Sequence, residues 1–338
     1  MTLRAEFASD NTAAAAPEAL QSLIEANHGA MASYGEDQIT ARAGDLIRQM
    51  LDADAEVRFV ASGTAANALS LAALCRPFEA VLAHQHAHVT ISETGAPGFF
   101  GGGLSVVGLP GASGRIELAA LQAALAEPDS PHQVSPAALS LTNATEYGAL
   151  YSLEQIRALT TAAKAVEPGL GVHLDGARLA VAAAAGLDLT ALKSVAIDIL
   201  VIGGTKAAMP PTEAIVLFDK ALVRRFDARL KQGGQMPSKA RFYAAPWIGM
   251  LESGGFIAHA RHANAMAQKL AAAQPFEILH PVETNGVFVA MDLATARRVH
   301  DAGWELERFA DGSVRLMCSW ATTDAEVEEV VEVLKSVV

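Results

Sequence analysis

Short apolar runs rich in β-branched residues alternate with helical stretches through most of the chain. Each run is long enough for a buried strand, and each helical stretch is long enough to connect two parallel strands. The expected strands span 57–61, 80–83, 104–107, 138–142, 171–174 and 197–202. The helices between them include one that follows residues 62–64 and carries Ala68, Leu69, Leu71 and Leu74, and others at 118–126, 153–166 and 177–185. A further run at 214–218 would add an antiparallel strand. The alternation predicts an α/β fold with a mostly parallel sheet wrapped by helices.

The pattern changes after Asp219, where charged and helical segments replace the alternation. Helices are expected at 221–231 and 324–337, and a long helical region that follows Pro237 runs to about residue 273. Strands are expected at 276–279, 287–291 and 314–317. This mixture predicts a small C-terminal α+β domain. At the other end, loop-like clusters surround an expected helix at 17–26, and a second helix is expected at 39–51. The predicted division is an N-terminal arm at 1–35, a large domain at 36–235, to which most of the candidate site residues described below belong, and a small domain at 236–338.

Charge and cysteine content narrow the class of protein. The formal net charge is −12, so a nucleic-acid backbone or an anionic membrane would repel the chain. Cys75 and Cys318 are too few for a disulfide framework, and we interpret both as core residues. No segment reaches the ~20 apolar residues of a membrane helix, and the first residues lack the apolar stretch of a signal peptide. We therefore expect a soluble cytoplasmic protein without a nucleic-acid or membrane partner.

An aspartate and a lysine follow two of the expected strands. Asp175 comes directly after the strand at 171–174, and Lys206 follows the strand at 197–202, behind two glycines and Thr205. A lysine amine can form a Schiff base with pyridoxal 5′-phosphate, and a carboxylate can keep the pyridine nitrogen of that cofactor protonated. Open α/β sheets bind ligands at the carboxyl ends of their parallel strands. The pair therefore predicts a pyridoxal-phosphate site, with a helix N-cap and a surface lysine as the alternatives.

A short glycine turn joins the first expected strand to the helix after it, at Ser62-Gly63-Thr64. The glycine permits close approach of a ligand, and the amino end of a helix offers N–H groups and a positive dipole to a phosphate. The same residues could serve only as a turn and an N-cap. Because Asp175 and Lys206 follow in an order that suits one site, we favour phosphate binding.

Three histidines alternate at His84, His86 and His88. On a strand they would share a face and could bind a metal ion. Neither cysteines nor carboxylates with zinc spacing accompany them, so we expect no metal site. We interpret His88 as stacked on an aromatic cofactor, with Glu93 about one helical turn away and facing the same site. The alternative for Glu93 is an exposed helix carboxylate.

Two arginines are candidates for binding a substrate carboxylate, because a guanidinium group can bind one through two hydrogen bonds. Arg178 follows the expected strand end closely, and Arg315 lies within the apolar run at 314–317, where an arginine needs a partner. A structural ion pair is the alternative for both. Ser9 and Tyr34, in the expected arm, are further substrate-site candidates or plain surface residues.

Taken together, these residues resemble the threonine aldolase family of fold-type-I pyridoxal-phosphate enzymes. The matching segments are Ser9-Asp10-Asn11, Tyr34-Gly35, Ser62-Gly63-Thr64-Ala65-Ala66-Asn67, His88, Glu93, His173-Leu174-Asp175-Gly176-Ala177-Arg178, Gly203-Gly204-Thr205-Lys206 and Arg315. They extend over nearly the whole chain, and the Asp-Gly-x-Arg and Thr-Lys segments are the most specific.

The resemblance implies a fold-type-I architecture with a seven-stranded type of sheet, and pyridoxal phosphate as cofactor. The cofactor would be bound by Ser62, Gly63, Thr64, His88, Asp175, Arg178, Thr205 and Lys206. It also implies a homotetramer, built as a dimer of dimers, with active sites at subunit interfaces. Tyr34 and the segment around Arg225 and Lys231 would then reach the site of a neighbouring subunit.

The activity implied is cleavage of a β-hydroxy-α-amino acid to glycine and an aldehyde. Arg315, Arg178 and Ser9 would hold the substrate carboxylate so that the Cα–Cβ bond stands perpendicular to the conjugated ring, which can then accept its electrons. The alternatives are β-elimination or transamination with the same cofactor, and a non-catalytic metal-binding module.

The base that removes the β-hydroxyl proton is a separate expectation. We favour His88, directly or through water ordered by Glu93, over Lys206, whose main task is the Schiff base.

One segment departs from the family pattern. Where many members carry Asn-Thr-His-Asn, this chain has Asn143-Ala144-Thr145-Glu146. The missing histidine is expected near the β-hydroxyl group of the substrate. The variant resembles low-specificity and phenylserine-type aldolases, which predicts that an aromatic β-substituent is accepted. The choice among threonine, allo-threonine and phenylserine stays open.

Overall fold

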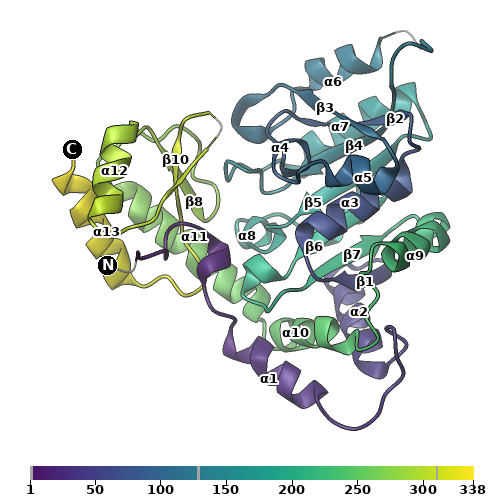
Figure 1. Cartoon of the computed structure of the whole chain (residues 1–338), viewed down its shortest axis with the longest axis horizontal. Helices are drawn as coiled ribbons and strands as arrows, with labels where there is room; N and C mark the ends of the chain where they lie inside the picture. Colours follow the sequence, from purple (N-terminus) through teal and green to yellow (C-terminus); the bar gives the residue numbers. More distant parts are fainter. Residues whose placement is uncertain (1–2, 128–129, 310) are drawn as a thin grey trace.

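A seven-stranded sheet lies at the centre of the larger part of the molecule, with its strands in the order β1-β7-β6-β5-β4-β2-β3 (Figure 1). The computed structural model describes residues 3–127, 130–309 and 311–338. The strands are β1 (Glu56–Val60), β2 (Glu79–His84), β3 (Ser105–Leu109), β4 (Ser135–Thr142), β5 (Gly171–Gly176), β6 (Ile199–Gly203) and β7 (Glu213–Leu217). β7 pairs antiparallel with β1 and β6, and the other neighbouring pairs are parallel. The expected mostly parallel sheet and its antiparallel addition are both confirmed.

Helices cover both faces of this sheet, as a parallel sheet requires. One face packs against α3 (Gly63–Leu74) and α9 (Val223–Gln232). The other face packs against α2 (Gln38–Leu51), α6 (Leu118–Leu125), α7 (Leu153–Val166), α8 (Leu179–Ala184) and α10 (Arg241–Glu252). Every residue of β5, β6 and β7 is buried. Burial on both faces explains why these strands appear in the sequence as continuous apolar runs rather than as alternating ones.

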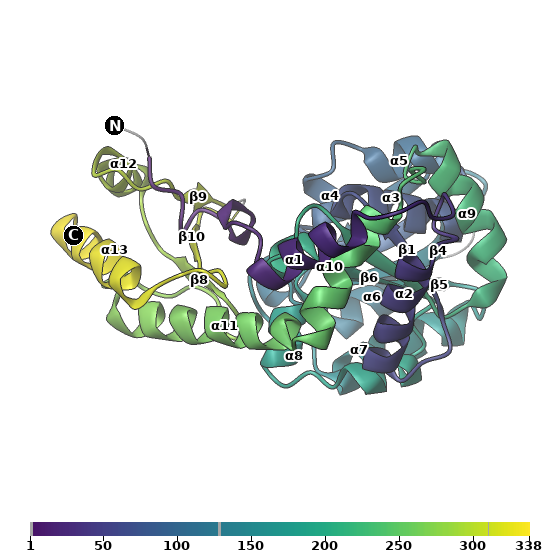
Figure 2. The ribbon, with the colours of Figure 1, turned by 90° about the horizontal axis from the view of Figure 1, so that it is seen from below.

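A three-stranded antiparallel sheet, in the order β8-β10-β9, forms the smaller part. Its elements are β8 (Gly286–Val289), β9 (Glu307–Arg308), β10 (Val314–Met317), α11 (Gly255–Ala273), α12 (Leu293–Asp301) and α13 (Asp324–Ser336). Figure 2 shows α11 running from the larger part to the smaller, with Ala260 in the large core and Leu270 in the small one. The strand expected at 276–279 is wrong, because Ile278 forms only an isolated bridge to Val289. β9 and α12 were not expected.

The amino-terminal residues contact both parts. Phe7 is fully buried in the small core, and its carbonyl oxygen accepts a hydrogen bond of 2.8 Å from the Met317 N–H. Farther along, α1 (Pro17–Ala26) packs against α10 in the larger part. The segment between them therefore crosses from one part to the other. Throughout the described residues, no helix combines the length and apolar character needed to cross a bilayer.

The division into an arm at 1–35, a large domain at 36–235 and a small domain at 236–338 stays a prediction, and residues 1–2 of the arm lie outside the described part. The packing of α10 bears on where the large domain ends. This helix contacts α1 and α2, and its Trp247 is fully buried in the large core. We therefore propose that the large domain continues past the expected end, through α10.

Candidate active site

A pocket lies at the carboxyl ends of the central strands, the edge at which open α/β sheets bind ligands. Its walls come from the amino end of α3, from the ends of β4 and β5, and from the segments that follow β2, β4, β5 and β6. The lining residues are Gly63, Asn67, His88, Thr142, Ala144, Glu146, Asp175, Ala177, Arg178 and Lys206. The structure thus brings Gly63, His88, Asp175, Arg178 and Lys206, all expected site residues, to one pocket.

Asp175 lies near the end of β5 and is almost fully buried. Its Oδ2 accepts a hydrogen bond of 2.8 Å from Nδ2 of Asn67, and its Oδ1 accepts one of 2.9 Å from the Ala177 N–H. Because both oxygens are engaged by groups on rigid elements, the orientation of the carboxylate is fixed.

Lys206 lies in a short turn, Thr205–Ala207, directly after β6. Burial lowers the pKa of its amine, and the charge of Arg178 lowers it further. A lower pKa leaves a larger fraction of the amine unprotonated and nucleophilic. Thr205 supports the turn, since its Oγ1 accepts a hydrogen bond of 3.2 Å from the Thr212 N–H.

The two glycines before this turn are needed for its close packing. A Cβ on Gly203 would lie 2.0 Å from the Ala177 carbonyl oxygen, and one on Gly204 would lie 2.4 Å from the Thr212 carbonyl oxygen. Any larger residue would therefore push the Lys206 turn away from β5 and β7, which explains the Gly-Gly-Thr-Lys sequence in local terms.

A chain of hydrogen bonds links the imidazole of His88 to Asp175. His88 begins a short helix, α4 (His88–Ile91), and its Nδ1 lies 2.8 Å from Oε1 of Glu93. Nδ2 of Asn67 donates both to this Oε1 and to Oδ2 of Asp175, at 2.8 Å each. The contact with Glu93 raises the pKa of His88, and burial raises the pKa of Glu93. Glu93 is thus a buried partner of His88 rather than an exposed carboxylate.

The other two histidines have separate partners. β2 ends at His84, so the histidine run is not a strand. Nε2 of His84 is paired with the Gly111 carbonyl oxygen at 3.0 Å, and Nδ1 of His86 is paired with the Tyr147 hydroxyl at 2.7 Å. The three imidazoles therefore do not face one common point.

The amino end of α3 meets the pocket at Gly63. Ser62 caps this helix, since its Oγ accepts a hydrogen bond of 3.3 Å from the Ala65 N–H. A Cβ on Gly63 would meet no atom within 4 Å, so the chain's own packing leaves open space beside it. Thr64 follows within the first turn. This arrangement offers helix N–H groups to an anion, as expected for the Ser62-Gly63-Thr64 segment.

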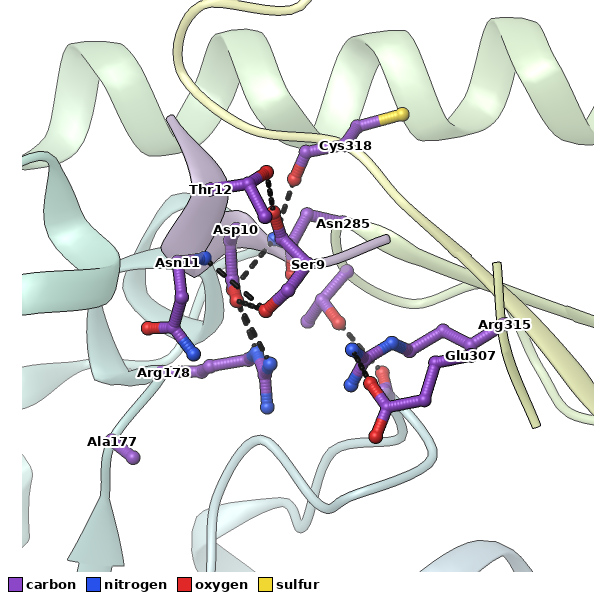
Figure 3. Close-up of polar contacts among 12 residues, drawn as sticks. Ser9, Asp10, Asn11, Thr12, Ala177, Arg178, Asn285, Glu307, Arg315 and Cys318 are labelled. Atoms are coloured by element: carbon purple, nitrogen blue, oxygen red, sulfur yellow. Dashed lines mark hydrogen bonds and ion pairs between the residues drawn. The ribbon is translucent and has the colours of Figure 1, made fainter. Parts of the chain in front are cut away.

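Arg178 is paired with an acidic residue of the amino-terminal segment (Figure 3). Its Nε and Nη2 donate to Oδ2 and Oδ1 of Asp10, at 2.8 and 2.9 Å. Burial alone would raise the pKa of Asp10, but the Arg178 guanidinium holds it well below its usual range. Nδ2 of Asn285 also donates to Oδ2 of Asp10, at 3.2 Å. The pair therefore ties the amino-terminal segment to the pocket.

Arg315 lies on β10 and is 5% exposed. Its Nη2 donates to the Ala8 carbonyl oxygen at 2.7 Å and also contacts Glu307, while its Nε is buried without a partner among the described residues. Burial and the charge of Arg178 lower its pKa to about 10. Figure 3 shows the two guanidinium groups and Ser9 gathered in the same region. Two neighbouring cations with an unused donor suit an anionic ligand.

Breaking the buried Asp10–Arg178 pair should destabilise the protein. Asp10→Asn leaves the guanidinium charge buried without a counter-charge, which typically costs about 3–5 kcal/mol. We expect a clear fall in the denaturant midpoint of unfolding. The control is Asp45→Asn, which breaks the Asp45–Arg48 pair on the surface of α2, with the Asp45 side chain 63% exposed. Exposed pairs contribute about 0–1 kcal/mol. Equal midpoint shifts in the two variants would contradict the role given to Asp10.

Tyr34, Arg225 and Lys231 do not line this pocket. The Tyr34 side chain is exposed, and Nζ of Lys231 lies 4.4 Å from the centre of its ring. Nη2 of Arg225 donates to the Cys75 carbonyl oxygen at 2.8 Å, at the end of α3. Their expected contribution to a neighbouring subunit stays a prediction.

Several residues that line the pocket or support its side chains were given no role from the sequence. Asn67 lies in the quoted Ser62–Asn67 segment, and its position four residues after Gly63, one turn of α3, could have indicated that it faces the same site. Glu213 is an acid at the start of an apolar run; its Oε2 accepts a hydrogen bond of 2.8 Å from the Gly204 N–H, and burial raises its pKa to about 7. Asp10 gave no local signal, because its partner is 168 residues away.

Comparison with known proteins shows independently which family the chain resembles in sequence and structure. The chain matches the family described as β-eliminating lyase over residues 6–294. It is 39% identical to the low-specificity L-threonine aldolases of Pseudomonas sp. (strain NCIMB 10558) and Pseudomonas aeruginosa, over 98% of this chain and 97% and 96% of theirs. The solved structure of Leishmania major threonine aldolase superimposes with a TM-score of 0.91 at 30% identity, over 99% of this chain and 100% of that one.

Proposed function

The chain belongs to the β-eliminating lyase family, and we propose that it is a pyridoxal-phosphate-dependent aldolase. It cleaves a β-hydroxy-α-amino acid of the L-threonine type between Cα and Cβ, which yields glycine and an aldehyde. The architecture is that of the fold-type-I pyridoxal-phosphate enzymes. The observation that carries the proposal is that Lys206 and Asp175 line one pocket at the strand ends of this fold.

The residues of the pocket fit pyridoxal phosphate in their chemistry. Lys206 offers an amine with a lowered pKa, Asp175 an oriented carboxylate, and His88 an imidazole that can stack on the ring. At Gly63 the amino end of α3 can receive the phosphate, because the space beside that residue is open. When bound, the cofactor supplies a conjugated, protonated ring able to accept the electrons of the breaking bond.

Each residue has a definite task in this account. Lys206 provides the nucleophilic amine that holds the cofactor. Asp175, held by Asn67 and the Ala177 N–H, keeps a proton on the pyridine nitrogen. His88 accepts the β-hydroxyl proton, directly or through water, and Glu93 holds Nδ1 of its ring. These groups are buried or half-buried, so their charges interact strongly.

The substrate carboxylate is placed by the cationic region beside the pocket. Arg315, whose buried Nε is free of a partner among the described residues, is the principal contact. Arg178 contributes its charge while it remains paired with Asp10, and Ser9 adds a hydroxyl. Holding the substrate carboxylate beside these two arginines orients the Cα–Cβ bond for cleavage.

Weakening the support of His88 should slow the reaction without releasing the cofactor. Glu93→Gln removes the negative charge beside Nδ1 of His88. A general base contributes about 10²–10⁴-fold, and we expect the variant to lose part of this, roughly tenfold in turnover. The measurement is kcat together with the visible absorbance of the cofactor. A variant that loses the absorbance would place Glu93 among the residues that retain the cofactor instead.

A product assay tests the proposed reaction against its rivals. Purified protein with pyridoxal phosphate and L-threonine should release glycine and acetaldehyde in equal amounts. Release of 2-oxobutanoate and ammonia would indicate elimination, and transfer of the amino group to an added 2-oxo acid would indicate transamination. Either outcome in place of glycine would overturn the proposed function.

The range of substrates follows from the Asn143-Ala144-Thr145-Glu146 segment. Thr145 stands at the position of the family's histidine and donates a hydrogen bond of 2.8 Å to the Ser113 carbonyl oxygen, while the next residue, Glu146, lines the pocket. We propose that the site also accepts allo-threonine and phenylserine. Comparing kcat/KM for the three amino acids gives the order of preference.

The assembly and the location of the protein are further proposals. A dimer of dimers would bury the exposed Tyr34 and the neighbouring Lys231 at an interface, next to another subunit's pocket. The acidic net charge of −12 suits the cytoplasm and an amino-acid substrate rather than a nucleic acid or a membrane surface.

A further inference from the structure

Glu146 is a pocket residue to which none of the roles above assigns a task. It lies between β4 and α7 and lines the same pocket as His88, Asp175 and Lys206. Its Oε1 accepts a hydrogen bond of 2.8 Å from the His88 N–H. This bond comes from the backbone at the start of α4, so the carboxyl group has a fixed orientation.

The second carboxyl oxygen has no partner. Oε2 of Glu146 is buried and makes no hydrogen bond within the described residues. A buried acceptor without a donor carries the full cost of its lost hydration, typically about 1–3 kcal/mol and more for a charged group. Such an atom in a ligand pocket is expected to receive a donor from the ligand.

The charged groups around Glu146 indicate which group of a bound ligand could donate a hydrogen bond to Oε2. Asp175 is negative and faces it across the pocket, while Arg178 is positive and already paired with Asp10. Thr142, at the end of β4, supplies a neighbouring hydroxyl whose interaction with the carboxyl group lowers the pKa of Glu146. The cofactor's phosphate is an anion and belongs near Gly63, and the substrate carboxylate is another anion that the arginines attract. The remaining donor on a β-hydroxy amino acid, apart from its amine, is the β-hydroxyl group.

We infer that Glu146 recognises the β-hydroxyl group of the substrate, with Oε2 accepting the hydroxyl hydrogen bond while the His88 N–H holds Oε1. This inference rests on the proposed aldolase function and names the residue that selects β-hydroxy substrates over amino acids without a hydroxyl. The contact fixes the position of the hydroxyl oxygen in the bound substrate, and the O–H bond then turns from Oε2 toward the imidazole, where His88 removes the proton. Glu146 is a positioning and specificity residue in this scheme, and no proton is transferred to it.

The protonation of Glu146 gives the recognition a pH dependence. Burial, with a smaller contribution from the negative charge of Asp175, raises the pKa of Glu146 to about 6, and the hydrogen bond from the His88 N–H opposes this rise. The charged or titratable groups around it are His88 on α4, Asp175 on β5, Arg178 before α8 and Lys206 after β6, together with Tyr147 and Tyr151 between β4 and α7. The carboxyl group of Glu146 is therefore ionised above about pH 6, and the charged acceptor that it offers to the hydroxyl group is lost as the pH falls through that value.

The test compares a substrate that has the hydroxyl with one that lacks it. Glycine reacts with the same cofactor but has neither a Cβ nor a β-hydroxyl group. Exchange of its Cα proton with deuterated water is therefore independent of any contact to a β-hydroxyl group. Glu146→Gln keeps the size and presents an amide, whereas Glu146→Leu removes the polar group. The control is Glu277→Gln, at an exposed glutamate of the smaller part. All four proteins are assayed as holoenzymes, and apoprotein is titrated with pyridoxal phosphate for its affinity.

We expect both Glu146 variants to lose roughly 10- to 100-fold in kcat/KM for L-threonine, the range of a hydrogen bond to a charged group. Glycine exchange and cofactor affinity should stay within about twofold of the unaltered protein, which is near the usual effect of a surface change. The decline of kcat/KM below about pH 6 should be weaker in Glu146→Gln, because the titrating carboxyl is absent. Glu277→Gln should match the unaltered protein throughout.

Three results would overturn the inference. Threonine cleavage that is unchanged in both Glu146 variants would show that the hydroxyl is recognised elsewhere. Loss of cofactor affinity in Glu146→Gln would make Glu146 a cofactor ligand, and loss of glycine exchange with affinity intact would give it a role at Cα. Failure of the proposed function is distinguishable, because the unaltered protein itself would then give no glycine from any β-hydroxy amino acid.

Discussion

Lys206→Ala should abolish turnover of every β-hydroxy amino acid. Among the described residues that line the pocket, Lys206 carries the one amine that can hold the cofactor covalently, and no general-acid or general-base effect can replace that bond. Because Lys206 sits in a turn fixed by Gly203 and Gly204, the shorter side chain should not disturb β6 or its neighbours. The measurements are steady-state turnover and the visible spectrum of the purified variant.

A surface lysine provides the control for this experiment. Lys335 lies on α13, with its side chain 51% exposed, and Lys335→Ala should keep full activity. Turnover at the normal rate in Lys206→Ala, with the cofactor still attached after reduction by borohydride, would contradict the assignment of Lys206.

Asp175→Asn should produce the second largest loss. The amide retains the shape of the carboxylate but has a single acceptor oxygen, so it keeps only one of the hydrogen bonds from Asn67 and the Ala177 N–H, and it cannot stabilise a positive charge on the pyridine nitrogen. Losing one preorganised electrostatic contact typically costs about 10²–10³-fold in kcat. We therefore expect a fall of that size, with the cofactor still bound covalently at Lys206.

The spectrum and the rate of Asp175→Asn have to be read together. Asp54→Asn is the control, since the Asp54 side chain is 88% exposed and pairs with Lys220 on the surface. If Asp175→Asn turned over at the rate of Asp54→Asn, the pyridine nitrogen would not depend on Asp175, and the proposed division of tasks would be wrong.

The centre of the sheet could be predicted because β5 and β6 are buried on both faces and β4 is buried at 138–141. Each of β4, β5 and β6 then appears as a short apolar run, and the helices between them are long enough to be recognised. Asp175 and Lys206 could be placed at one edge for the same reason, since parallel strands end together. The smaller part was harder. β9 has only the residues Glu307–Arg308, and α12 is short and charged, so neither gives a strong periodic signal.

The contacts between distant segments could not be predicted from the sequence. Asp10 and Arg178 are both visible in the chain, but nothing local indicates that the amino-terminal segment folds back to pair them. In the same way, Asn67 could be placed near a phosphate, yet its bridge between Glu93 and Asp175 depends on how α3, α4 and β5 meet. Glu146 was noticed only as a departure from the family pattern, and its unpaired oxygen is a property of the folded pocket.

The most direct test of the account is to find where the cofactor is attached. Holoenzyme is reduced with borohydride, digested, and mapped by mass spectrometry for the peptide that carries the pyridoxyl group. We expect the group on Lys206, in the peptide that includes Gly203-Gly204-Thr205, and on no other lysine. A pyridoxyl group on a different lysine, or a protein that takes up no cofactor at all, would contradict the account at its centre.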